Sequence, residues 1–171
     1  MKQQKQKQRE KILARLAPED FVGRDGELNQ LYGHAAGESD SRGLLLLAAP
    51  MCGASELLRQ TYDRIFQRQN EIIPFYFAFS SGDKSARQTA VRFLQTFLLQ
   101  TVAFRRRDAR LLSIAPDVCE ISDLAAPADA HWIYQLIKTC KSESDLADEA
   151  SFIRAAFSAP HAAARGPPVR A

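Results

Sequence analysis

The stretch from residue 44 to residue 60, LLLLAAPMCGASELLRQ, has residue types and spacing that could hold phosphate. Phosphate-binding loops follow the pattern Gly-x-x-x-x-Gly-Lys-Ser/Thr, in which backbone N–H groups and the lysine ammonium contact the phosphate oxygens. The four fixed positions fall here on Ala48, Gly53, Ala54 and Ser55. The second glycine and the hydroxyl are present, but alanine replaces the lysine. We therefore expect weak phosphate binding at most.

Other residues of the loop alter the cradle further. Pro50 has no N–H and removes one donor, and Ala48 places a methyl group where the pattern has glycine. Ser55 stands where the pattern's hydroxyl contacts Mg²⁺. Cys52 also lies in the loop, but none of the three histidines is a convincing general base for it. Thiol catalysis is therefore poorly supported.

The elements that would position this loop are a strand before it and a helix after it. Residues 43–49 are apolar without alternation, which predicts a fully buried strand. The apolar residues that follow recur at helical spacing, which predicts a helix over 54–68. A second strand is predicted at about 72–79, where aromatic and β-branched residues are dense. Further helices are expected over 3–17, 25–36 and 84–104, with two more split near Ser142.

A second motif, FVGRDGELNQL, stands at residues 21–31, shortly before the leucine run. Its order and spacing relative to the loop resemble the N-terminal part of AAA+ and STAND-type P-loop ATPases, nearest to the origin-recognition-like branch. The resemblance covers roughly residues 18–105. It implies an ATP-binding domain in which backbone around Val22, Gly23 and Arg24 closes the base pocket.

The same resemblance implies that the loop binds the phosphates and that Ser55 holds Mg²⁺. The implied cofactor-binding residues of the loop and of the helix start are Ala48, Ala49, Pro50, Met51, Cys52, Gly53, Ala54, Ser55 and Glu56. The fold expected on this basis is α/β, an incomplete P-loop NTPase-like domain, rich in helix, with two strands. We expect a basic helical arm at 1–17, the partial domain at 18–158, and a flexible Ala/Pro/Gly-rich tail or linker at 159–171.

The acidic strand that ATP hydrolysis requires is missing from the sequence. No hydrophobic run ends in an Asp or Glu pair that could hold Mg²⁺ and position water. The sequence also stops about where the family's next strand would begin. We therefore expect a truncated N-terminal fragment, which would be an ATPase within an intact parent chain but inactive alone.

Composition and charge limit the other classes of function. The first 16 residues contain six Lys or Arg and one Glu, so their net charge is +5, against +3 for the whole chain. Such an arm can bind phosphates of nucleic acid or anionic lipid, but more often it is a solvated helix end. No RNP, zinc-finger or clear helix-turn-helix signature supports nucleic-acid binding. No run approaches the roughly 18 apolar residues of a membrane span, and no signal peptide is present, so a cytoplasmic protein is expected.

The main alternative is a P-loop relic without catalysis, used as a scaffold that binds a protein partner or associates with itself. The missing lysine, the proline in the loop and the absent acidic strand all favour it. The three widely spaced cysteines show no CxxC pair, so we expect neither a disulfide framework nor a zinc site.

Overall fold

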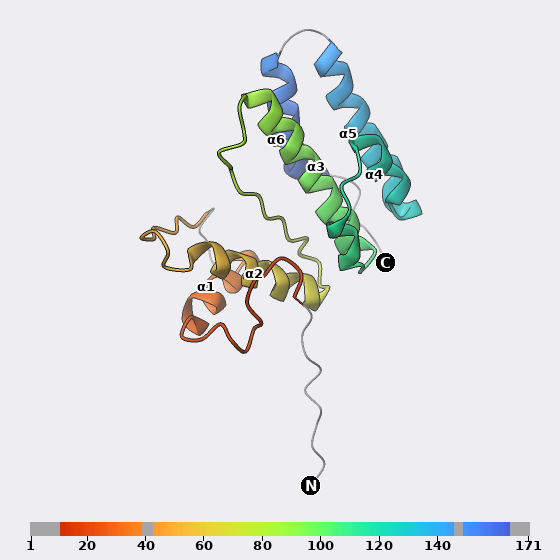
Figure 1. Cartoon of the computed structure of the whole chain (residues 1–171). Coiled ribbons are helices and arrows are strands. Elements are labelled where there is room, and N and C mark those ends of the chain that lie inside the picture. Colours follow the sequence, from red (N-terminus) through yellow and green to blue (C-terminus); the bar gives the residue numbers. More distant parts are fainter. Residues whose placement is uncertain (1–10, 39–42, 146–148, 165–171) are drawn as a thin grey trace. The chain divides into compact units, whose positions relative to one another are not determined.

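The computed structural model describes residues 11–38, 43–145 and 149–164, and every regular element in these ranges is helical. The described residues divide between Pro74 and Phe75 into two compact units (Figure 1). Because every regular element among the described residues is helical, the predicted α/β fold with two strands is wrong. Residues 43–49 and 72–79 are extended but pair with no neighbouring strand among the described residues. A strand needs such a neighbour to satisfy its backbone groups.

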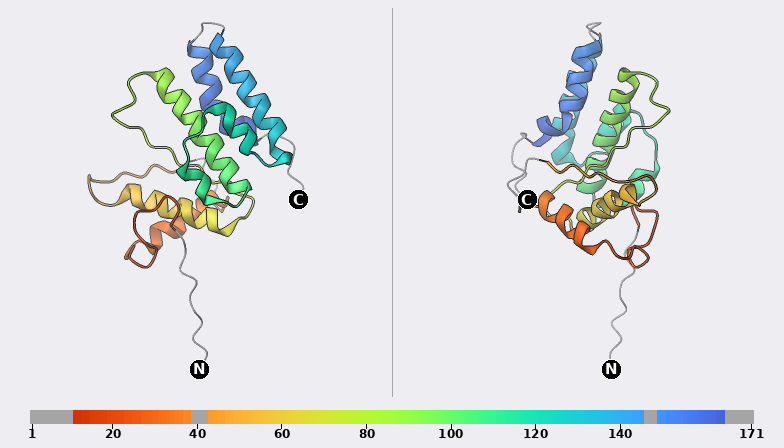
Figure 2. Two further views of the ribbon diagram at one scale, coloured as in Figure 1. Left: turned by 45° about the vertical axis from the view of Figure 1, so that its right-hand side comes forward. Right: turned by 90° about the vertical axis from the view of Figure 1, so that its left-hand side faces the viewer.

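Unit 1 is built on two helices, α1 (Asp25–Ala35) and α2 (Ala54–Arg68), which pack against each other (Figure 2). One face of α2 supplies most of the buried apolar side chains of this unit: Leu57, Tyr62, Ile65 and Phe66. At about 100° per residue, these four side chains lie within one half of the circumference of the helix. α2 is therefore the element around which unit 1 is organised.

The limits of α2 are those predicted, residues 54–68, and the backbone explains both ends. Gly53 precedes the helix with a φ of 85°, and Gln69 follows it with a φ of 50°. Both values lie in the left-handed region, which an α-helix cannot contain. The predicted helix at 25–36 is also confirmed: α1 begins at Asp25 and ends at Ala35, one residue before the predicted limit.

Two buried carboxylates of α2 bind the main chain of residues 12–16. Asp63 accepts hydrogen bonds from the N–H groups of residues 12, 13 and 14, at 2.8, 2.8 and 3.2 Å. Glu56 Oε1 accepts from the N–H groups of Arg15 and Leu16, each at 2.9 Å. Because these amides are bound by side chains of α2, they make no helical hydrogen bonds. The helix predicted at 3–17 is thus wrong for residues 11–17, and residues 3–10 lie outside the described ranges.

Unit 2 is a helical bundle of α3 (Ala86–Arg105), the 3-10 helix η1 (Ala109–Ser113), α4 (Val118–Leu124), α5 (Pro127–Asp145) and α6 (Glu149–Ala164). Figure 1 shows α3, α5 and α6 as roughly aligned rods, and α6 packs against both α3 and α5. The core lies between them and is largely aliphatic, with Leu98, Val102, Ile121 and Ile133 almost completely buried. The bundle confirms the long helix predicted at 84–104 and the presence of two helices after it, but the break predicted near Ser142 is wrong, because Ser142 lies inside α5.

The extended segment 75–79 is held by side chains of α3 instead of by a strand. The Gln100 side-chain amide accepts from Tyr76 N at 2.8 Å and donates to Tyr76 O at 2.9 Å. Phe75 packs edge-on against Phe93 and Phe97, with ring centroids 5.0 and 5.5 Å apart. One glutamine thus makes the two hydrogen bonds that a neighbouring strand would otherwise make to Tyr76.

Two helical stretches of unit 2 differ from the prediction. No helix was predicted at α4, which begins with a capping box: Asp117 accepts from Glu120 N while the Glu120 carboxylate accepts from Asp117 N. α6 continues to Ala164, so residues 159–164 of the expected tail are helical, and residues 165–171 lie outside the described ranges.

In the part of the chain that the structure describes, no helix combines the length and apolar character needed to cross a lipid bilayer.

Candidate functional site

The loop singled out by its sequence joins an extended segment to the start of α2 in unit 1. Ala49 O accepts a hydrogen bond from Cys52 N at 3.3 Å, which closes a turn with Pro50 at its second position. Met51, at the third position, has a φ of 62°, the arrangement of a type II turn. Helix α2 begins at Ala54, so Ser55 lies in its first turn, as predicted.

The N-terminus of α2 has free hydrogen-bond donors. No side chain caps it, and among the described residues no protein acceptor contacts the N–H groups of Ala54, Ser55 or Glu56. Unpaired amides at this end carry a partial positive charge and favour anions. A phosphate could therefore take the place of the missing cap.

Arg24 connects the second sequence motif to this loop. Its Nη2 donates to Cys52 O at 3.1 Å, and its Nη1 donates to Glu27 Oε1 at 2.8 Å. The guanidinium also holds the pKa of the Glu27 carboxyl below its ordinary value. Glu27 thus orients Arg24, which in turn supports the loop from the side of α1.

A hollow of about 250 Å³ lies against the loop and the first turn of α2. It is lined by the predicted residues Arg24, Ala48, Ala49, Cys52, Gly53 and Ala54, together with Leu46, Leu47 and Leu57. Arg24 is the one charged side chain among these residues, so the hollow combines apolar walls with a single cation. A volume of this size suits a small ligand and is slightly below the usual range of ligand pockets, roughly 300–1,000 Å³.

The remaining predicted residues lie outside this lining. Val22 has 82% of its surface exposed, Gly23 has a φ of 81°, and Pro50, Met51 and Ser55 are exposed. Glu56 is buried, and its carboxylate binds the amides of residues 15 and 16, away from any ligand in the hollow.

The residues present suit an anion better than a complete catalytic centre. The uncapped amides and Arg24 provide positive potential, and the Ser55 hydroxyl would be the first-turn ligand of a Mg²⁺ ion bound with nucleotide. Within the described ranges, no three His, Cys, Asp or Glu side chains gather in a group that could hold a metal. No carboxylate lines the hollow to orient water for hydrolysis.

Sequence reasoning did not identify the apolar walls of the hollow or the buried carboxylates of α2. Leu46 and Leu47 were expected inside a sheet, yet Leu47 remains 83% exposed while it borders the hollow. Glu56 and Asp63 are spaced seven residues apart in a helix, which puts them on one face. That spacing was the available signal for a shared polar role.

Comparison of the chain with protein-family models, with curated proteins and with solved structures finds no match.

Proposed function

We propose that unit 1 binds the phosphates of a nucleotide at the loop 48–55, with ATP as the nucleotide that the likeness to AAA+ and STAND-type ATPases implies. The observation that carries this proposal is the 3.1 Å hydrogen bond from Arg24 Nη2 to Cys52 O. It joins the two motifs on which the likeness depends, although they are far apart in sequence. The uncapped amides at the start of α2 supply the donors that phosphate oxygens require.

Binding at this loop is expected to be weak and to lead to no useful hydrolysis. Ala54 brings no charge to the β- and γ-phosphates, and Pro50 contributes no N–H. Ser55 would supply one hydroxyl to Mg²⁺, but among the described residues no carboxylate lines the hollow to supply a second ligand or to orient water. The proposed role is therefore that of a nucleotide-binding domain without complete catalytic machinery.

The test is calorimetric titration of Mg-ATP into the natural chain and into the Ala54→Lys variant. The natural chain is expected to bind with a dissociation constant in the high micromolar range or weaker. The new ammonium would face the phosphates from the first turn of α2 and strengthen binding by about tenfold. Ala35→Lys is the matched control, because it adds the same charge at an exposed site in the last turn of α1. Equal affinity in all three proteins would refute the proposal.

A second candidate function, a scaffold that binds protein, is favoured by the exposed leucines before the loop. Leu45 and Leu47 are 84% and 83% exposed, and Met51 is fully exposed. Residues 43–48 are extended, and among the described residues none of their backbone groups is paired. An extended apolar segment of this kind can pair with a strand of another chain. Sedimentation of the natural chain and of a Leu45→Asp, Leu47→Asp variant tests whether a second copy of this chain is the partner. Self-association through this segment predicts assembly that the variant loses, and a natural monomer contradicts self-association.

A further inference from the structure

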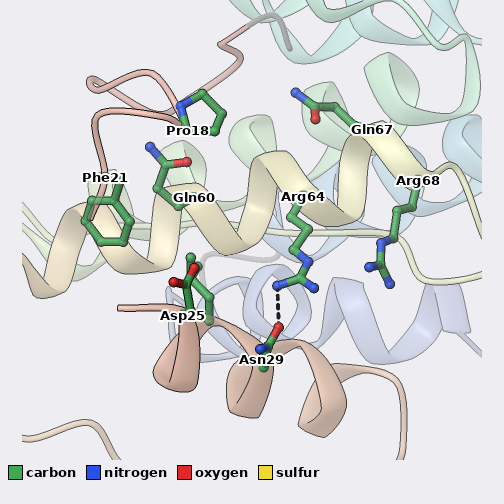
Figure 3. A pocket seen from close by; sticks show the side chains of 9 residues that line it. Pro18, Phe21, Asp25, Asn29, Gln60, Arg64, Gln67 and Arg68 are labelled. Atoms are coloured by element: carbon green, nitrogen blue, oxygen red, sulfur yellow. Dashed lines mark hydrogen bonds between the residues drawn. The ribbon is translucent and has the colours of Figure 1, made fainter. Parts of the chain in front are cut away.

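A second hollow of unit 1, distinct from the loop, lies between α1, α2 and the segment before α1 (Figure 3). Its volume is about 310 Å³. Polar side chains face it from both helices, and Pro18 and Phe21 form an apolar wall: the polar residues are Asp25, Asn29, Gln60, Arg64, Gln67 and Arg68. This hollow contains none of the residues of the phosphate-binding motif.

Two arginines of α2 that line this hollow, Arg64 and Arg68, both contact the ring of Tyr32. The guanidinium carbon of Arg68 lies 3.9 Å from the centroid of the Tyr32 ring, and that of Arg64 lies 5.1 Å from it. Tyr32 is itself fixed, because its hydroxyl accepts a hydrogen bond from Asn70 Nδ2 at 3.2 Å. Arg64 Nη1 also donates to Asn29 Oδ1 at 2.8 Å. The two cations are therefore positioned before any ligand arrives.

Among the residues that the structure describes, the pair has no acidic partner to balance its charge. Within the described part of the chain, neither Arg64 nor Arg68 forms a salt bridge, and Arg68 donates to no protein acceptor. Like charges four residues apart on a helix destabilise it by a few tenths of a kcal/mol. Asp25 is the single carboxylate of the lining, and Figure 3 shows it beside Phe21, toward the other end of the hollow. An anion that contacts both guanidiniums from the hollow would reduce this repulsion.

Interaction with the C-terminal end of α2 does not fully explain the placement of the two arginines. Cations in the last turn of a helix interact with its C-terminal carbonyl groups, and Arg68 is in that turn. Arg64 lies one turn earlier, and its guanidinium bonds to Asn29 of α1 instead of to a carbonyl of α2. The pair is therefore directed across the hollow toward α1, as Figure 3 shows.

We propose that this hollow is a binding site for a small organic anion, in which Arg64 and Arg68 bind an oxyanion and Phe21 with Pro18 contacts a ring-sized apolar body. The planar guanidinium suits both carboxylate and phosphate, since each presents two oxygens to its fork of donors. The volume accommodates one ring with its acid group but no extended peptide.

The experiment is an NMR titration of the full chain with four probes at millimolar concentration: phenyl phosphate, benzoate, inorganic phosphate and neutral benzyl alcohol. Backbone amide shifts of α1 and α2 locate the binding. At least one of the two ring-bearing anions is expected to bind, and which of them binds more tightly identifies the oxyanion. Inorganic phosphate and benzyl alcohol are expected to bind more weakly, because the first has no ring and the second has no negative charge.

Variants connect the binding to the two arginines. Arg64→Gln and Arg68→Gln are each expected to weaken binding by about tenfold. Arg154→Gln, an equal change of charge at an exposed position of α6, is expected to leave it unchanged. Arg64→Lys keeps the charge and loses the fork, so it is expected to weaken binding less than Arg64→Gln. Circular dichroism of each variant checks that the helices are retained.

Two outcomes would overturn the proposal. One is the absence of binding by both ring-bearing anions. The other is a set of shifts confined to residues 49–56 together with loss of binding in Arg24→Gln, which would place the anion at the loop instead. Loss in Arg64→Gln and Arg68→Gln, with no change in Arg24→Gln, supports a separate site.

Discussion

Replacing Asp63 by alanine is expected to release residues 12–14 from α2. The carboxylate is 3% exposed and is the acceptor of three backbone N–H groups, from Ile12, Leu13 and Ala14. Alanine at this position leaves all three donors without an acceptor. Buried donors that lose their partner are costly, so the segment is expected to detach and bind water.

The magnitude follows from the three hydrogen bonds and the cost of burying the charge. Each hydrogen bond to a charged group contributes about 1.5–3 kcal/mol, and the three share one acceptor, so they do not add fully. Burial also disfavours the carboxylate and raises the pKa of Asp63, which offsets part of the gain. We therefore expect Asp63→Ala to lower the free energy of opening this segment by about 3 kcal/mol.

Hydrogen exchange of the three amides measures this free energy directly. A loss of about 3 kcal/mol corresponds to roughly hundredfold faster exchange at Ile12, Leu13 and Ala14. Asp63→Asn keeps one carbonyl acceptor and should accelerate exchange less. Asp123→Ala, at an exposed position of α4, is the control and should change nothing at these amides. Unchanged exchange in Asp63→Ala would refute the role assigned to this carboxylate.

Three further predictions concern titration, the strand-like segment and the bundle core. Burial raises the pKa of Asp63 above its ordinary value of 3.8, so the contribution of this group to the stability of unit 1 is expected to be fully present below pH 3.8 and to be lost as the pH rises through the raised pKa. Exchange measured across this range should show this slope, and Asp63→Asn should abolish it. Gln100→Leu removes both hydrogen bonds to Tyr76 and should speed hydrogen exchange of the Tyr76 amide by about tenfold. Unchanged exchange would show that aromatic packing alone holds the segment. Leu98→Ala should lower the free energy of unfolding by about 3 kcal/mol, measured in urea by the fluorescence of the chain's one tryptophan. Leu99→Ala, at a half-buried position, should cost clearly less. Equal costs would contradict the packing described.

Sequence patterns located the helices well because the signals for a helix are local. The apolar spacing of α2 and the glycine before it lie within the helix or next to it, and both of its limits were predicted. The capping box of α4 was also visible, as Asp117 followed three residues later by Glu120, but it was overlooked. These elements needed no information about distant parts of the chain.

The errors arose where structure depends on a distant partner. Four leucines indicate a buried strand only if other strands flank it, and Leu45 instead stands exposed in an unpaired segment. Residues 11–17 have a helical pattern, yet Asp63 binds their amides from about fifty residues away in sequence. At the candidate site, the loop and its junction with α2 could be predicted from local pattern. The contact of Arg24 with Cys52 O could not, because it depends on how α1 packs against α2.

The attachment of residues 12–16 to α2 has a consequence for how freely this part of the sequence can vary. Asp63 and Glu56 contact N–H groups, which every amino acid except proline supplies in the same form. Selection acting on this attachment would therefore restrain the two acids while leaving the identities of Arg15 and Leu16, which are both exposed, almost unrestricted. In a library randomised at those two positions, proline would be the one residue consistently lost.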